Sequence, residues 1–246
     1  MDACELVFLK RELIDIARAR QQHAAYEACL RELGLTVISL PPEPEYPDAV
    51  FVEDPAIVLE ELAVMTCTGA ESRRGESASL ARELGRFRTL RWMREPATLD
   101  GGDVMRAAHK LYVGHSGRTT AAGIQQLAAQ VEPFGYRVQP VDVHGCLHLK
   151  SACSYLGDGK VLVYRPWVDA AAFAGLHVID ALDAEAVNVL RIGTSVLVAE
   201  GFPRTADTIT ALGLRVRTLD NSELRKAEGA LTCCSLLFPT AAPPPS

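Results

Sequence analysis

The sequence predicts an α/β fold in which five similar units of about 45 residues surround a common axis. The chain has 246 residues, of which 48% are apolar and 23% charged, a composition typical of a globular protein with a sizeable core. A short run containing arginine precedes a helical pattern at three places, residues 69–84, 114–131 and 201–213. Because one unit of this size cannot bury its own apolar face, such repeats imply a radial arrangement.

Each unit is predicted to run from a helix into a strand. Serine or threonine lies near each helix start, where the hydroxyl can accept a hydrogen bond from a free backbone N–H. Apolar residues then follow at helical spacing, for example Ile124, Leu127 and Val131. A glycine ends the helix, and a strand rich in β-branched residues follows it. These runs cover residues 33–40, 134–141 and 212–219, with a weaker copy at 84–93 and a degraded unit at 176–201.

Each predicted strand leads through a turn to a polar position, and a hairpin follows. These positions are about 45 residues apart and hold Glu53 and Asp54, Asp100 to Asp103, His148, Asn188 and Cys233. Structural repeats tend to hold similar residues at equivalent positions, whereas these differ in their chemistry. Since radial repetition directs one position of each unit toward the axis, the divergence predicts a composite active site.

The residue types at these positions suit one kind of reaction. A thiolate is a nucleophile toward an electron-poor carbon, and a nearby imidazole can lower its pKa and carry protons. Two carboxylates that face one axis repel each other unless a cation lies between them. Aspartate, histidine and cysteine in this proportion form an unusual metal ligand set, so we predict no metal. A planar guanidinium or amidine fits better, because its N–H donors match carboxylates on two edges.

Each of these residues also has a purely structural interpretation. His148 alternates with apolar neighbours, as core histidines do, and a cysteine such as Cys233 often serves as a small buried apolar residue. The acidic residues at 48–54 also fit a turn and a strand edge, and those at 100–103 a tight turn. Solvated charges at helix starts would account for Arg73, Arg74 and Arg118. The helix dipole disfavours cations there, however, and a bound carboxylate would explain them.

Composition and charge exclude several other classes of protein. The formal charge is −6 and no long Lys/Arg run occurs, which disfavours nucleic acid or a membrane surface as partner. No apolar run approaches the roughly 20 residues of a membrane helix, and the first residues lack a signal-peptide pattern. Seven scattered cysteines favour reduced thiols and a cytoplasmic location, and they lack the repeated pairs of a zinc site. We expect a single domain over residues 1–238 and a disordered tail at 239–246.

Seven short motifs occur in order along the chain. They are YPDAVFVEDP (46–55), GAESRRGE (69–76), TLDGGDV (98–104), GRTTAAG (117–123), LHLKSACSYL (147–156), GFPRT (201–205) and GALTCCS (229–235). Together they resemble the dimethylarginine dimethylaminohydrolases, which belong to the guanidino-group-modifying superfamily of amidinotransferases and arginine deiminases. The resemblance covers roughly residues 20–238. It implies a five-bladed α/β propeller, in agreement with the pseudo-fivefold repeat.

Carried over by position, the resemblance implies a catalytic role for Cys233, His148 and Asp100. Cys233 is expected to be the nucleophile and His148 the general acid and base, while Cys234 occupies a non-catalytic position. Asp54 and Asp100 are expected to bind the guanidinium group. Some family members carry glutamate where this chain has Asp100, which keeps the charge but changes its reach.

The resemblance also implies a set of residues that bind the amino-acid end of a substrate. Arg73 and Arg118 correspond to the pair that binds the substrate α-carboxylate. Asp48 and Glu53 lie where the family orients the substrate and neighbouring side chains. The carbonyl of Ala227 is expected to accept a hydrogen bond from the α-amine.

The implied reaction is hydrolysis of Nω-methylated L-arginine to L-citrulline and a methylamine through a covalent cysteine adduct. It requires no cofactor, and the partner is a small cationic guanidino amino acid; the protein is expected to be a monomer or a homodimer. The alternatives are an arginine deiminase-type enzyme or another substituted-guanidine hydrolase, and then a non-catalytic propeller that binds a partner. Family members usually begin with an extra strand and a flexible lid loop, whereas here only residues 1–17 precede the RARQQH helix. Either the lid is shorter or the given start lies inside the natural reading frame, and substrate preference is the expectation that this affects most.

Overall fold

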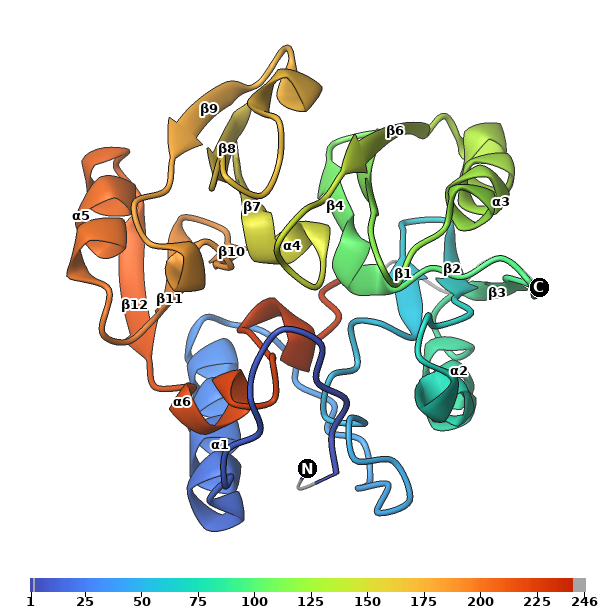
Figure 1. Cartoon of the computed structure of the whole chain (residues 1–246), viewed down its shortest axis with the longest axis horizontal. Coiled ribbons are helices and arrows are strands. Elements are labelled where there is room, and N and C mark those ends of the chain that lie inside the picture. The colour runs from blue at the N-terminus through green and yellow to red at the C-terminus, as the bar shows by residue number, and fades with distance from the viewer. Residues whose placement is uncertain (2, 241–246) are drawn as a thin grey trace.

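The computed structural model describes residues 1 and 3–240 of the chain, which form an α/β fold arranged in sectors around a centre (Figure 1). The described residues form four three-stranded sheets. The first comprises β1 (Ala56–Val58), β2 (Leu62–Met65) and β3 (Thr89–Trp92), and the second β4 (Val104–Ala107), β5 (Lys110–His115) and β6 (Arg137–Asp142). The third comprises β7 (Cys153–Gly157), β8 (Lys160–Val163) and β9 (His177–Asp180), and the fourth β10 (Leu190–Ile192), β11 (Ser195–Ala199) and β12 (Arg215–Leu219).

All four sheets share one topology. Their first two strands form an antiparallel hairpin, and the third strand pairs parallel to the second after a crossover connection. Three of the crossovers carry a helix, namely α2 (Ser77–Leu84), α3 (Ala121–Val131) and α5 (Pro203–Ala211), whereas the third sheet has only a 3₁₀ turn at Ala170–Phe173. The predicted hairpin and outer strand are therefore present in four sectors, and the predicted helix in three of them.

Local signals in the sequence act as expected at the helix ends. The hydroxyl of Thr120 accepts a hydrogen bond from the Gly123 N–H and caps α3. The glycines that follow two of the helices, Gly135 and Gly213, both have φ of 81°, a left-handed conformation that favours glycine. These glycines allow the chain to reverse from each helix region into the outer strand.

The fifth sector differs from the prediction. It contains α1 (Ile16–Glu32), which packs against the short α6 (Ser222–Arg225), but residues 33–40 do not form the expected strand. In the other sectors that strand pairs with the second strand of a hairpin, and residues 235–240 form no strand among the described part of the chain. Without a pairing strand, β-forming residues cannot complete a ladder. The described residues therefore form an α/β fold with four sheets, and the expected five complete blades are not observed.

Apolar residues pack between the sectors and leave polar residues at the centre. One cluster joins the first two sheets to α3 through Val64, Val113 and Leu127, and another joins the second and third sheets around Tyr112 and Phe173. The buried polar residues Asp54, Asp100, Asp103, His148 and Asn188 lie outside these clusters. The fold therefore concentrates ionisable groups near the axis, as the repeat predicted.

The C-terminal residues do not all follow the prediction of a disordered tail at 239–246. Pro239 accepts a hydrogen bond from the Arg88 guanidinium, so the start of the predicted tail contacts the domain, while residues 241–246 lie outside the described part of the chain. None of the helices in the described residues has the length and apolar character needed to cross a membrane.

Candidate active site

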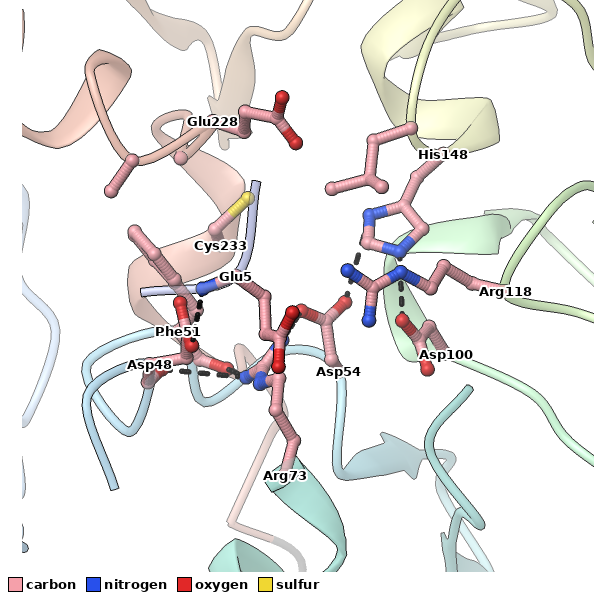
Figure 2. A pocket seen from close by; sticks show the side chains of 13 residues that line it. Glu5, Asp48, Phe51, Asp54, Arg73, Asp100, Arg118, His148, Glu228 and Cys233 are labelled. Atoms are coloured by element: carbon pink, nitrogen blue, oxygen red, sulfur yellow. Dashed lines mark hydrogen bonds and ion pairs between the residues drawn. The ribbon is translucent and has the colours of Figure 1, made fainter. Parts of the chain in front are cut away.

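A pocket lies at the centre of the molecule and is lined by side chains from segments far apart in the sequence (Figure 2). Its lining includes eight of the nine residues proposed from the sequence: Asp48, Asp54, Arg73, Asp100, Arg118, His148, Ala227 and Cys233. It also includes five residues that the sequence did not single out: Glu5, Phe51, Leu147, Glu228 and Gly229. Four of the five polar positions of the repeat thus meet in one cavity, whereas the fifth, Asn188, does not line it.

Cys233 lies in the 3₁₀ turn Thr232–Cys234 and is half-buried. Its sulfur accepts a hydrogen bond from the Ala230 N–H at 3.4 Å, and Figure 2 shows the sulfur and the His148 ring on facing sides of the pocket. Burial raises the pKa of the thiol well above its usual value, and the carboxylates of Glu53 and Asp54 raise it further. The thiol is therefore protonated at neutral pH until a cation enters the pocket.

His148 is buried between two carboxylates. Its Nε2 lies 2.9 Å from Oδ2 of Asp100, and its Nδ1 lies 3.9 Å from Oδ1 of Asp54. Burial alone would lower the pKa of the imidazole, but Asp54 and the hydrogen bond with Asp100 more than offset this and raise the pKa to about 9. His148 is therefore cationic at neutral pH and able to donate a proton.

The glycines of the Asp-Gly-Gly-Asp motif explain why these groups can approach so closely. A Cβ at Gly102 would lie 2.5 Å from Nδ1 of His148 and 2.8 Å from Oδ1 of Asp54. The Gly102 N–H also donates a hydrogen bond to Oδ1 of Asp54 at 3.0 Å. The motif is therefore more than a tight turn, because it makes room for the imidazole beside the carboxylate.

Asp103, the last residue of this motif, positions His148 through a hydrogen bond to the residue that follows it in the sequence. Its carboxylate accepts hydrogen bonds from the hydroxyls of Ser116 and Thr119 and from the Leu149 N–H, all at 2.7 to 2.8 Å. Leu149 is the first residue of α4 (Leu149–Ala152), and His148 is the N-cap of that helix. The second aspartate of the motif thus fixes the segment that carries the imidazole.

We expect Gly102→Ala to lower kcat/KM by roughly tenfold to a hundredfold, because the added methyl group displaces His148 or Asp54 from the reacting position. Gly117→Ala is the matched control, since a Cβ at Gly117 meets no atom within 4 Å. Steady-state kinetics of both variants, with melting temperatures to confirm folding, measure the effect. A Gly102→Ala enzyme as active as Gly117→Ala would contradict the role given to this close approach.

The two predicted carboxylate-binding arginines have different surroundings. Arg73 is buried, pairs with Asp54 at 2.5 Å and with Glu76 at 2.8 Å, and donates to the Phe51 carbonyl at 2.9 Å. The Arg118 guanidinium, in contrast, makes no hydrogen bond or ion pair with any described residue although Arg118 is only 9% exposed. Arg118 is therefore the cation available to a ligand, while Arg73 serves the protein's own carboxylates.

Asp54 remains ionised because of these neighbours. Burial alone would raise its pKa, but His148 and Arg73 lower the pKa to about 2. The only described group with a spacing that suits a metal ion consists of Asp54, Asp100 and His148, whose ligand atoms lie within 4.8 Å of one another. We assign no metal to it, because Arg73 and the imidazolium already neutralise these carboxylates.

The N-terminal loop closes one side of the pocket. The Glu5 N–H donates to Oδ2 of Asp48 at 3.0 Å, and the Glu5 carboxylate accepts a hydrogen bond from the Ser72 hydroxyl at 2.6 Å. The carboxylate of Glu228 accepts hydrogen bonds from three successive backbone N–H groups, those of Val7, Phe8 and Leu9. The first residues of the chain therefore contribute Glu5 to the pocket lining and are held there by hydrogen bonds to Asp48, Ser72 and Glu228.

Glu53 is the predicted site residue that does not line the pocket. Its carboxylate contacts the Lys150 ammonium and the Thr232 hydroxyl instead, on the side away from the cavity. The expectation that it orients the substrate therefore lacks a direct contact in this structure. The sequence analysis included Lys150 only as a member of the motif around His148 and did not predict a role for it.

Comparison with known proteins agrees with this arrangement of residues. Residues 3–194 match the family model for N,N-dimethylarginine dimethylhydrolase, eukaryotic. The chain is 39% identical over 229 residues to an N(G),N(G)-dimethylarginine dimethylaminohydrolase of Streptomyces coelicolor, which covers 93% of this chain and 89% of the relative.

Two solved structures share the fold over almost the whole chain. One is a cysteine-to-serine mutant of the Pseudomonas aeruginosa dimethylarginine dimethylaminohydrolase in complex with citrulline, with a TM-score of 0.91, 33% identity, and coverage of 95% of this chain and 93% of that one. The other is a histidine-to-glycine mutant of a dimethylarginine dimethylaminohydrolase as an adduct with S-methyl-L-thiocitrulline, with a TM-score of 0.88, 34% identity, and coverage of 92% and 90%. By sequence, fold and the residues of its central pocket, this chain belongs to the dimethylarginine dimethylaminohydrolase family.

Proposed function

We propose that the protein hydrolyses Nω-methylated L-arginine to L-citrulline and a methylamine. The observation that carries the proposal is the convergence of Cys233, His148, Asp54 and Asp100 on one pocket. The citrulline complex and the thiocitrulline adduct of the two related enzymes support the same substrate class. The enzyme is thus a hydrolase that acts on a C–N bond of the guanidino group.

In the proposed complex, charge complementarity orients the substrate. The carboxylates of Asp54 and Asp100 bind the guanidinium, and the unpaired Arg118 guanidinium binds the α-carboxylate. Asp48 and the carbonyl of Ala227 accept hydrogen bonds from the α-ammonium group. Arg73 acts indirectly, because it keeps Asp54 ionised and fixed.

The first half of the reaction forms a covalent adduct. The bound guanidinium lowers the pKa of the Cys233 thiol, which releases its proton to solvent, and the thiolate attacks the central guanidino carbon. The bond from this carbon to the methylated nitrogen breaks, and that nitrogen takes a proton from His148 and leaves as the amine. An S-alkylthiouronium group remains attached to Cys233.

The second half releases citrulline. His148, now neutral, removes a proton from a water molecule, which attacks the same carbon. The C–S bond breaks with its electron pair going to the sulfur, the second proton of the water passes to that sulfur, and the oxygen of the water becomes the ureido oxygen of citrulline. The imidazolium and the thiol of the resting enzyme are then restored.

A substrate panel tests the role of Arg118 and the proposal as a whole. Monomethylarginine and dimethylarginine are expected to be turned over, whereas agmatine, which lacks the α-carboxylate, should be poor. Arg118→Ala should lower kcat/KM for dimethylarginine by at least about tenfold, since a charge-assisted hydrogen-bonded pair is lost, but should leave the value for agmatine almost unchanged. Preference for unmethylated arginine over both methylated substrates would overturn the proposed substrate.

We also propose how the remaining features of the chain are organised. The fifth sector, with residues 33–40 and 235–240, is an incomplete fifth blade of a propeller that forms one domain over residues 1–238. A cytoplasmic location is supported by the seven free cysteine thiols. The protein acts as a monomer or a homodimer, a point that light scattering of the purified protein tests.

A further inference from the structure

Four side chains form a group linked by hydrogen bonds and one ion pair beside the turn of the nucleophile, which we call the rear network: Glu53, Lys150, Asn188 and Thr232. Lys150 is half-buried, and the other three are buried. The Lys150 ammonium lies 2.5 Å from Oε1 of Glu53, and the Thr232 hydroxyl donates to Oε2 of Glu53 at 2.7 Å. Glu53, Asn188 and Thr232 are each 7% exposed. None of the four lines the pocket that contains Cys233.

The rear network holds both sides of the nucleophile's backbone. The Asn188 side-chain carbonyl accepts a hydrogen bond from the Thr232 N–H at 3.1 Å, and its NH₂ donates to the Thr232 hydroxyl and to the Lys150 carbonyl, both at 3.0 Å. The Glu53 N–H donates to the carbonyl of Cys233 at 3.2 Å. The residue before the nucleophile is therefore fixed at its N–H and its hydroxyl, and the nucleophile itself at its carbonyl.

The charges of the rear network also act on the thiol. The Glu53 carboxylate opposes ionisation of Cys233, since it raises the pKa of the thiol in addition to the effect of burial. Lys150 pairs with this carboxylate and lowers the pKa of Glu53, which burial raises. The pair therefore gives Thr232 a charged acceptor while limiting the net negative charge behind the sulfur.

We infer that Glu53 is a positioning residue, which with Lys150, Asn188 and Thr232 holds the turn carrying Cys233 and sets the charge behind its sulfur without contacting the substrate. The inference rests on the proposed function, because it takes Cys233 as the nucleophile. It differs from the role that the sequence implied for Glu53, which was to orient the substrate. The two roles predict different results when no substrate is present.

The test measures alkylation of Cys233 by iodoacetamide as a function of pH, in a Cys234→Ser background and without substrate. Other charged or titratable groups near the thiol are the same in every variant: Tyr26, Asp54, Arg118, His148 and Glu228. Glu53→Gln should lower the apparent pKa of alkylation by about one unit, because a negative charge is lost and the Lys150 ammonium is left unpaired. The matched double variant Glu53→Gln/Lys150→Met should lie between Glu53→Gln and the parent protein.

A second pair of variants tests the hydrogen bonds separately from the charge, and remains informative if Glu53→Gln does not fold. Thr232→Val removes the hydroxyl at nearly constant volume and should lower kcat by roughly tenfold with little change in KM, because the nucleophile is displaced. Thr232→Ser keeps the hydroxyl and should restore most of kcat.

Two results would overturn the inference. One is an alkylation profile of Glu53→Gln that superimposes on the parent profile while KM rises, since this is the behaviour of a substrate-orienting residue. The other is equal activity of Thr232→Val and Thr232→Ser. The alkylation result needs no turnover and the Thr232 result compares two variants on the same substrate, so both are distinguishable from failure of the proposed function, which would appear as no hydrolysis of methylated arginine by the parent protein.

Discussion

Cys233→Ser is expected to reduce the rate of citrulline formation from dimethylarginine by at least about a thousandfold, because a hydroxyl is a far weaker nucleophile than a thiolate. The pocket can promote ionisation of the nucleophile only when that nucleophile is a thiol. A guanidinium cation between Asp54 and Asp100 lowers the raised pKa of the Cys233 thiol, so that a thiolate can form near neutral pH. The pKa of a serine hydroxyl is too high for the same cation to produce an alkoxide. Initial rates at saturating substrate, measured on the folded variant, check the prediction.

The neighbouring cysteine provides a matched control. Cys234 does not line the pocket, and its side chain packs instead among apolar residues such as Leu197 and Leu231. Burial raises the pKa of its thiol to about 12, so it is inert at neutral pH. Cys234→Ser should therefore keep most of the activity, and equal, complete loss in both variants would contradict the choice of Cys233.

A covalent label extends the same comparison to the resting enzyme. A haloamidine should modify Cys233 selectively, because the carboxylates of the pocket bind its cationic amidine beside the sulfur. Mass spectrometry of the labelled peptide distinguishes this from modification of Cys234. Reaction spread over several cysteines would instead indicate a pocket that does not recognise amidines.

Much of the fold was predictable because its signals are local and repeated. Helix caps such as Thr120 and helix-ending glycines such as Gly135 act within a few residues, so the sequence alone predicts them. Residues 33–40 carry the same local signals yet form no strand, because a strand also needs a hydrogen-bonding neighbour. That partner is a property of the distant C-terminal residues, on which the local pattern carries no information.

In the candidate site, too, some features were predictable from local sequence patterns and others were not. The repeat spacing predicted which segments reach the axis, and His148, Asp100 and Cys233 all line the pocket. It did not predict which of two adjacent residues faces the cavity. Asp54 lines the pocket while Glu53 contacts Lys150 and Thr232 instead. Both residues lie in the turn before β1, where no strand alternation indicates which side chain faces the cavity.

Long-range pairing explains the different roles of the two arginines. In the sequence, Arg73 and Arg118 both precede a helical pattern and look equivalent. Only the folded chain brings Asp54, which lies 19 residues away in sequence, against Arg73 and thereby occupies its guanidinium. Within residues 1 and 3–240, the Arg118 guanidinium has no such partner, and this makes Arg118 the predicted determinant of substrate carboxylate binding.

His148→Asn is expected to lower kcat for dimethylarginine by about a hundredfold to ten-thousandfold, because the asparagine cannot protonate the departing amine or activate water. The loss depends on the leaving group. With S-methyl-L-thiocitrulline, methanethiol is a weakly basic leaving group that departs with little protonation, so the first half of the reaction should continue. The variant should then release one equivalent of methanethiol per active site and stall as the Cys233 adduct, which mass spectrometry of the protein detects.

The control for this experiment is His115→Asn, because His115 is exposed and its imidazole pairs with the exposed residue Asp142. This variant should retain normal kcat with both substrates. Since removal of His148 leaves Asp54 and Asp100 without their imidazole partner, the melting temperature of His148→Asn must show that it remains folded at the assay temperature. Continuous turnover of S-methyl-L-thiocitrulline by folded His148→Asn would show that another group activates the water. A normal kcat for dimethylarginine would exclude His148 from the mechanism.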